Sequence, residues 1–169
     1  MVIEATNLDI YGDAELPWSR AAQALDNYVG GPGGPAFLST VRPDGRPHTA
    51  AVGALWLDDG FYFTSGETTR KARNLAVNPA CTIAVSLDGI DLVVEATATV
   101  VTAAETLERI AARYREAGWS AEVDGAAFTA PYSAPSAGPA PWQLYFATPH
   151  TVIGVGTAEP NGATRWRLT

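Results

Sequence analysis

The sequence predicts a mainly β, α+β fold in which an antiparallel barrel of seven or eight short strands is flanked by three helices. Strand-like segments outnumber helix-like ones. Most neighbouring strands are joined by turns such as Pro43-Asp44-Gly45 and Asp58-Asp59-Gly60, which are typical of hairpins. A closed or nearly closed barrel removes exposed strand edges. The 169 residues show no repeat and no linker, which predicts a single domain over residues 1–169.

Three segments have a helical pattern. Residues 16–29 form the first, which ends at the Gly- and Pro-rich loop over residues 30–35. The second begins after Gly66 and ends near Asn78, because the proline that follows disfavours helical geometry there. A capping box over residues 102–105 predicts the start of the third. Their apolar faces consist of Trp18, Ala22, Leu25 and Tyr28 or Val29 in the first helix, and of Leu107, Ile110, Ala111 and Tyr114 in the third.

The remaining periodic segments predict strands. Alternation of apolar and polar residues is clearest over residues 91–101. Residues 1–15 are interpreted as an arm or a disordered N-terminus, and residues 118–141, rich in Ala, Pro and Gly, as a long binding loop without regular structure. The predicted strands are 36–41, 48–57, 61–64, 81–87, 91–101, 142–147, 152–155 and 164–168.

Composition limits the classes of partner and site. The formal charge of −7 argues against nucleic acid or an anionic membrane as the main partner. The single cysteine, Cys81, lies in an apolar run and predicts a buried strand residue, which excludes an internal disulfide or a cysteine-based zinc site. No metal-ligand spacing such as H-E-x-x-H occurs. Without an apolar run of membrane-spanning length or a signal peptide, a cytoplasmic location is expected.

The only lysine, Lys71, lies in a cluster of three cations at the start of the second helix, beside Arg70 and Arg73. A helix N-terminus normally favours acidic residues, because its free N–H groups and dipole are positive. Cations at that position indicate either a site for a small anion, built from N–H groups, hydroxyls and cationic side chains, or a solvated helix face.

Few residues suggest chemistry by the protein alone. His48 and His150 are the only histidines, and both are interpreted as surface or structural residues rather than general acids. No serine lies in a G-x-S-x-G elbow, and no G-x-G-x-x-G follows a strand. We therefore assign no catalytic residue and expect a cofactor to supply the reaction.

Three runs carry a family resemblance: FLSTVRPDGRPH at residues 37–48, FYFTSG at 61–66 and KARNLAVNP at 71–79. With PYSAPSAGPAPW at 131–142 and TRWR at 164–167, they resemble the pyridoxamine 5'-phosphate oxidase-like split β-barrel, and within it the flavin/deazaflavin oxidoreductases, B group, which use coenzyme F420. The resemblance covers nearly everything from residue 37 onward. It implies an antiparallel split β-barrel with flanking helices.

The resemblance also implies a homodimer with two cofactor sites at the subunit interface. Lys71, Arg73 and Asn74 fall on the segment that binds the cofactor phosphate. Residues of the second strand would lie beside its tricyclic ring, and C-terminal residues would reach the site from the partner subunit, unless they are core and surface residues of their own protomer. The remaining implied cofactor residues are Val52, Gly53, Ala54, Leu55, Thr64, Ser65, Thr69, Arg70, Trp142, Arg165 and Trp166.

The second strand favours F420 over FMN, because residues 49–56 carry no cation where pyridoxamine-phosphate oxidases place basic residues. The expected activity is hydride transfer from reduced deazaflavin to an electron-poor double bond, such as an enone, imine or tetrapyrrole bridge. Trp119, Phe128 and Tyr132 on the loop over residues 118–141 are candidates for a wall of the substrate pocket. An FMN-dependent oxidase or reductase and a non-catalytic flavin- or haem-binding protein are the alternatives.

Overall fold

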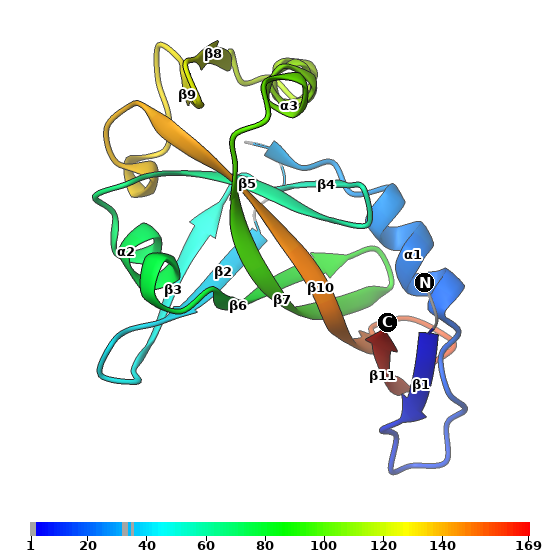
Figure 1. Ribbon diagram of the computed structural model, residues 1–169. Helices are drawn as coiled ribbons and strands as arrows, with labels where there is room; N and C mark the ends of the chain where they lie inside the picture. Colours follow the sequence, from blue (N-terminus) through cyan, green and yellow to red (C-terminus); the bar gives the residue numbers. More distant parts are fainter. Residues whose placement is uncertain (1–2, 32–33, 35) are drawn as a thin grey trace.

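One long strand, β10 (Trp142–Gly156), organises the sheet of this protein in the computed structural model (Figure 1). The structure describes residues 3–31, 34 and 36–169. Within these ranges eleven strands belong to one antiparallel sheet, whose main path runs β1-β11-β10-β7-β6-β2-β3. Outside this path, β5 and β9 pair with β10, β4 pairs with β5, and β8 pairs with β9. The path ends at β1 and β3, so the described sheet bends around the core without closing into a ring.

The strands cover the predicted β segments apart from residues 53–54, and three further strands, β1, β8 and β9, are present. Cys81 lies buried in β6, as predicted. The other strand bounds are β1 Ile3–Asn7, β2 Ala36–Val41, β3 Pro47–Val52, β4 Leu55–Leu57, β5 Gly60–Gly66, β6 Ala80–Leu87, β7 Ile90–Val101, β8 Glu122–Asp124, β9 Ala127–Thr129 and β11 Ala163–Leu168.

The three predicted helices are present as α1 (Trp18–Asp26), α2 (Arg70–Val77) and α3 (Ala104–Glu116). None of the described helices is long and apolar enough to cross a membrane. Thr69 caps α2, because its side-chain oxygen accepts a hydrogen bond of 3.3 Å from the Ala72 N–H.

The capping box predicted for α3 is not formed. The N-cap position is Ala103 rather than Thr102, and no side-chain hydrogen bond caps this helix. The strand β7 continues to Val101, so that Thr102 belongs to the connection and lies one residue outside the position that a capping box requires.

Two hydrophobic clusters fill the molecule. The first lies between the sheet and α1 and includes Leu25, Phe61, Leu92 and Trp166. The second lies beneath α3, where Ile110, Tyr114, Phe128, Trp142 and Leu144 pack together. Because successive strand residues point to opposite faces, β10 contributes to both clusters.

The predicted strand over residues 48–57 is interrupted at Gly53 and Ala54, which separate β3 from β4. At the break, the Gly31 N–H donates to the Ala54 carbonyl at 2.9 Å. A Cβ on Gly30 would lie 1.9 Å from the same oxygen, so glycine there permits the close approach of the two backbones. The predicted loop over residues 30–35 falls partly outside the described residues.

Other differences concern how segments pair within the sheet. The predicted strands over residues 142–147 and 152–155 form the single strand β10, with a register shift between Pro149 and Thr151. The predicted loop over residues 118–141 is not structureless, because it contains β8, β9 and a 3₁₀ helix, η2 (Pro135–Ala137). In the N-terminal segment, β1 pairs with β11 over residues 3–7 and is therefore an ordered arm.

We predict that Thr69→Ala lowers the free energy of unfolding by about 1 kcal/mol, because the first turn of α2 loses its cap. Thr102→Ala is the matched control and should change it by less than about 0.5 kcal/mol, since Thr102 caps nothing. Urea unfolding measures both. An equal loss in the two variants would contradict the assignment of the caps.

Candidate functional site

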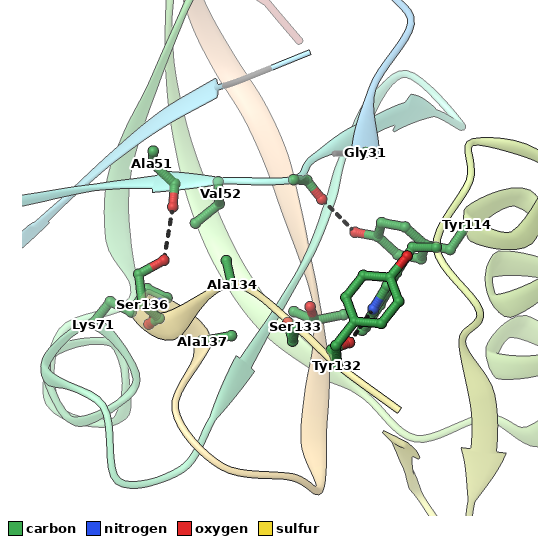
Figure 2. A pocket seen from close by; sticks show the side chains of 13 residues that line it. Gly31, Ala51, Val52, Lys71, Tyr114, Tyr132, Ser133, Ala134, Ser136 and Ala137 are labelled. Atoms are coloured by element: carbon green, nitrogen blue, oxygen red, sulfur yellow. Dashed lines mark hydrogen bonds between the residues drawn. The ribbon is translucent and has the colours of Figure 1, made fainter. Parts of the chain in front are cut away.

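A cavity of about 350 Å³ lies where the β3–β4 break, the first turn of α2, the end of α3 and the η2 segment meet (Figure 2). Small side chains from the β3 side form one wall, and aromatic rings form another. Lys71 is the only charged residue among the described lining residues. The lining consists of Gly31, Ala51, Val52, Gly53, Thr64, Lys71, Tyr114, Trp119, Tyr132, Ser133, Ala134, Ser136 and Ala137.

The side chain of Lys71 is enclosed although it carries an amine. Lys71 is only 2% exposed, and its Nζ donates a hydrogen bond to the Ser136 carbonyl. Within the described residues, Lys71 takes part in no ion pair. Burial lowers the pKa of Lys71, because removal from water disfavours the charged amine. An anionic group in the cavity would supply the missing countercharge.

Residues 132–138, here called the strap, pass over this amine and are held at both ends by tryptophan. The indole N–H of Trp119 donates to the Tyr132 carbonyl at 2.7 Å, and that of Trp142 donates to the Gly138 carbonyl at 2.9 Å. Between these ends, the Ser136 hydroxyl donates to the Ala51 carbonyl on β3 at 3.3 Å. The strap therefore forms one wall of the cavity and is bonded to both β3 and α2.

Tyr114 links α3 to the floor of the cavity. Its hydroxyl lies 2.8 Å from the Gly53 carbonyl, to which it donates, and 3.3 Å from the Tyr62 carbonyl. Burial raises the pKa of Tyr114, which keeps the phenol protonated and able to donate. Gly53 lies at the β3–β4 break, so this bond fixes the backbone that lines the cavity.

The structure brings four of the predicted cofactor residues to the cavity: Val52, Gly53, Thr64 and Lys71. Ala54 and Leu55 are buried in the two hydrophobic clusters instead.

Three further predicted residues make internal polar contacts near the start of α2. The hydroxyls of Ser65 and Thr69 lie 2.7 Å apart, and that of Thr69 also donates to the Gly66 carbonyl at 3.0 Å. The Asn74 amide donates to the Thr40 hydroxyl at 3.0 Å and is buried. The contacts of Ser65 and Thr69 stabilise the β5–α2 connection that presents Lys71, whereas the Asn74 bond joins α2 to β2.

The predicted cationic cluster is divided between different surfaces of α2. Arg70 is exposed, and Arg73 lines a second groove, of about 400 Å³, with Glu67, Gln143 and Tyr145. Residues two apart in an α-helix lie roughly 200° apart around its axis, so Lys71 and Arg73 cannot share one face. Within one protomer they therefore do not line the same cavity.

The three C-terminal candidates lie outside the cavity. Trp142 is buried in the second cluster, although its indole holds the strap. Trp166 is 0% exposed and packs edge-on against Trp18 with 5.5 Å between ring centroids, which supports a core position over contact with a partner subunit. Arg165 lies on β11 opposite Ile153, and its buried Nε has no hydrogen-bond partner in the described structure.

Sequence reasoning missed much of the lining. Of the three aromatic residues expected to form a wall, Trp119 and Tyr132 do line the cavity, whereas Phe128 is buried in the second cluster. Tyr114 was expected only as a core residue. A tyrosine on an apolar helix face was a usable signal, because its hydroxyl needs a polar partner when buried.

Neither histidine lines the cavity. His48 lies on β3, and burial lowers its pKa, with further lowering by Arg42, Lys71 and Arg70. No group of three His, Cys, Asp or Glu side chains in the described part of the chain is arranged to hold a metal ion.

Comparisons show what this chain is similar to. The profile of a family described as pyridoxamine 5'-phosphate oxidase matches residues 34–140. A pyridoxine/pyridoxamine 5'-phosphate oxidase of Acidothermus cellulolyticus is 37% identical over 90 residues, which span 50% of this chain and 40% of that relative.

Solved structures resemble it at lower identity. An F420 reductase is 23% identical with a TM-score of 0.51, over 75% of this chain and 94% of that chain. A pyridoxamine 5'-phosphate oxidase-related, FMN-binding protein of Nostoc punctiforme is 19% identical with a TM-score of 0.59, over 91% and 92% of the two chains. These likenesses confirm the predicted split β-barrel fold, here with an open sheet.

We predict that Lys71→Met raises the free energy of unfolding at pH 7 by about 0.5–2 kcal/mol, because it removes a buried charge without a countercharge. The folded state binds the Lys71 proton less tightly than the unfolded state does. The gain should therefore be full at low pH and shrink as the pH rises toward the ordinary lysine pKa of about 10.4. Urea unfolding between pH 6 and pH 10 measures this.

The matched control for that series is Arg70→Met, which removes an exposed cation from the adjacent position. A lower stability of Lys71→Met than of Arg70→Met at pH 7 would show that the bond to the Ser136 carbonyl outweighs the cost of burying the amine.

Proposed function

This chain belongs to the pyridoxamine 5'-phosphate oxidase family, and we propose that it is an F420-dependent oxidoreductase acting on an electron-poor small molecule. The observation that carries the proposal is Lys71, a buried amine without a described countercharge at one end of an otherwise uncharged cavity. This chain contributes few reactive side chains, which is consistent with an oxidoreductase whose flavin cofactor supplies the chemistry. The single, unpaired Cys81 suits a reducing cytoplasm.

The cavity fits the chemistry of a planar anionic cofactor. Ala51, Val52 and Gly53 form a wall of small residues, which permits close approach of a flat ring. Trp119 and Tyr132 offer aromatic surface. A volume of about 350 Å³ lies within the range of small-molecule sites. Lys71 would hold the phosphodiester of F420.

Bound F420 in its reduced form supplies a hydride. The part of this chain is to position the ligand, to exclude water and to supply charge at Lys71. The described lining contains no carboxylate, histidine or thiol, and the Tyr114 hydroxyl is already bonded to Gly53. We assign no residue as the proton donor, and the proton that completes a reduction comes from solvent or from an unassigned donor.

FMN is the second candidate cofactor, and the likeness to an FMN-binding protein of Nostoc punctiforme favours it. F420 is preferred because β3 and β4, which lie within residues 47–57, carry no lysine or arginine to hold a phosphate monoester beside the ring. A single buried lysine suits the single charge of a phosphodiester better than the double charge of FMN.

We further propose that the protein is a homodimer. An apolar row crosses the outer face of the sheet, because Phe37 pairs with Ala84, Ala84 with Val93, and Val93 with Ile153. Residues paired across antiparallel strands point to the same face. Phe37 is 50% exposed and Val93 is 37% exposed, so a second copy that packs on this row would bury them.

We predict that Phe37→Asp shifts the dimer toward monomer, because the carboxylate would be buried without a partner at the interface. Ile10→Asp is the control, since Ile10 is 82% exposed on the N-terminal segment. Light scattering coupled to size exclusion measures the mass. A wild-type monomer, or a dimer in both variants, would contradict the proposed interface.

Titration of the purified protein with F420 and, separately, with FMN tests the cofactor. Lys71→Met should weaken F420 binding by about 1.5–3 kcal/mol, which is the usual value of a charge-assisted contact. Arg73→Met should have a smaller effect, because Arg73 lies in the other groove. Arg113→Met is the control, since Arg113 pairs with Glu116 on the outside of α3.

The outcomes separate the candidate functions. Micromolar binding of F420 with weaker FMN binding supports the proposal, and reduction of an electron-poor substrate completes it. Preferential binding of FMN favours the FMN-dependent enzyme. Binding without turnover over a panel of such substrates favours a flavin carrier, and binding of neither cofactor overturns the assignment.

A further inference from the structure

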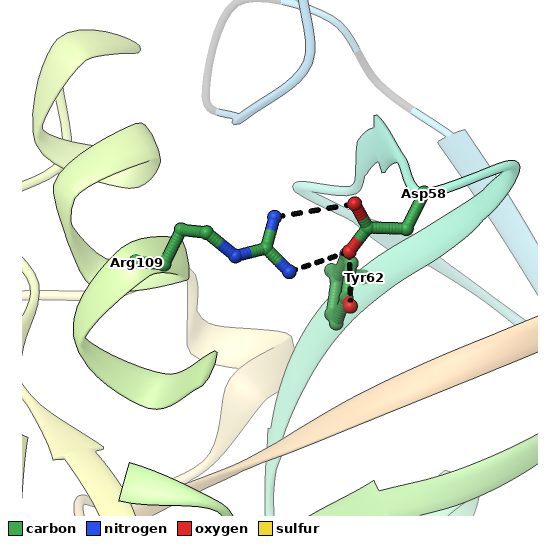
Figure 3. Close-up of polar contacts among 3 residues, drawn as sticks. All are labelled: Asp58, Tyr62 and Arg109. Atoms are coloured by element: carbon green, nitrogen blue, oxygen red, sulfur yellow. Dashed lines mark hydrogen bonds and ion pairs between the residues drawn. The ribbon is translucent and has the colours of Figure 1, made fainter. Parts of the chain in front are cut away.

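We propose that Arg109 is a positioning residue for the cavity, because its ion pair with Asp58 lets α3 hold the short strand β4 at both ends (Figure 3). One end of β4 follows Gly53, whose carbonyl accepts the Tyr114 hydroxyl. The other end precedes Asp58, whose carboxylate accepts Arg109. The effect on cofactor binding rests on the proposed function, whereas the effect on the backbone does not.

The Asp58 side chain receives bonds from two elements. The Arg109 guanidinium approaches it in a two-point geometry, at 3.2 Å and 2.5 Å, and the Tyr62 hydroxyl donates to it at 2.8 Å. Asp58 and Asp59 both have φ of +56°, the left-handed geometry of a tight hairpin turn. This turn fixes the direction of the carboxylate toward α3.

The strand β4 needs such support because it is short. It has three residues and pairs only with β5, outside the main path of the sheet. Its other edge therefore lacks a described strand partner. Arg109 and Tyr114 lie on the same helix, and Tyr114 is buried in the core of the second cluster. The helix thus acts as a rigid brace between the two ends of β4.

The ion pair contributes little by itself to stability. The side chains of Arg109 and Asp58 are 46% and 45% exposed, and exposed pairs contribute about 0–1 kcal/mol. A local pair on the same helix, Arg113 with Glu116, is similarly exposed but joins no second element. The two pairs therefore differ in what they connect, and this makes Arg113 the matched control.

The test compares Arg109→Met with Arg113→Met in hydrogen exchange of the ligand-free protein. Exchange of the backbone amides over residues 51–55 should be faster by about threefold in Arg109→Met. This is the size of effect expected when one exposed ion pair is lost. Arg113→Met should match the wild type, and Arg109→Lys should recover part of the difference. The dissociation constant for F420 should rise by a similar factor in Arg109→Met only.

Asp58→Asn provides a second variant if Arg109→Met folds poorly, because asparagine tolerates the left-handed turn but removes the charge. Equal exchange over residues 51–55 in the Arg109 and Arg113 variants would overturn the proposal. Faster exchange in Arg109→Met with an unchanged dissociation constant for F420 would show that Arg109 does not position the cavity for the cofactor, and would overturn that part of the proposal. If the wild type bound neither F420 nor FMN, the proposed function would fail, while the exchange comparison would still decide the role of Arg109.

Discussion

The sheet and the cavity depend on one constraint: β10 pairs with β7 along most of one edge, where β9 meets it only at Trp142, and changes neighbours along the other edge. It pairs with β7 over residues 144–156. On its other edge it pairs with β5 over residues 142–147 and with β11 over residues 151–155. The register shift at Pro149 and Thr151 lies between these two regions. A bulge bends a strand and increases its twist, so β5 and β11 leave β10 in different directions.

The cavity follows from the direction that β5 takes. The strand β5 ends at Gly66 and leads into the capped start of α2, which presents Lys71. A Cβ on Gly66 would lie 2.8 Å from the Ala137 carbonyl, so the strap approaches this connection as closely as glycine allows. The amine, the β3–β4 break and the strap thus come together because β5, α2 and the segment before β10 share one corner of the fold.

Local patterns in the sequence were sufficient for the main elements and for Lys71. The alternation in β7, the turns at Gly45 and Gly60 and the proline after Asn78 are signals that act over a few residues. The hairpin of β8 and β9 is local, but it lies in a segment whose Ala, Pro and Gly content predicted a loop. The interruption after Val52 and the strand β1 depend instead on partners far along the chain. Short-range periodicity does not contain that information.

Less of the candidate site than of the fold was predictable, because its residues come from segments that are distant in the sequence. Helical geometry alone separates Lys71 from Arg73, so this difference could have been expected from their spacing. By contrast, the meeting of Tyr114 with Gly53 joins residues that are 61 positions apart. Trp166 belongs to a run that carries the family resemblance and is also a fully buried residue of the first cluster, a placement that the run by itself does not indicate.

The enclosure of Lys71 also determines how the protein responds to chemical modification. Since this chain has no other lysine, the exposed basic side chains of its described surface are guanidinium groups, apart from histidine. Guanidinium groups do not react with ordinary acylating reagents because they remain protonated. Acylation of a side-chain amine is therefore confined to Lys71, and its rate reports how accessible this enclosed amine is to a reagent in solvent.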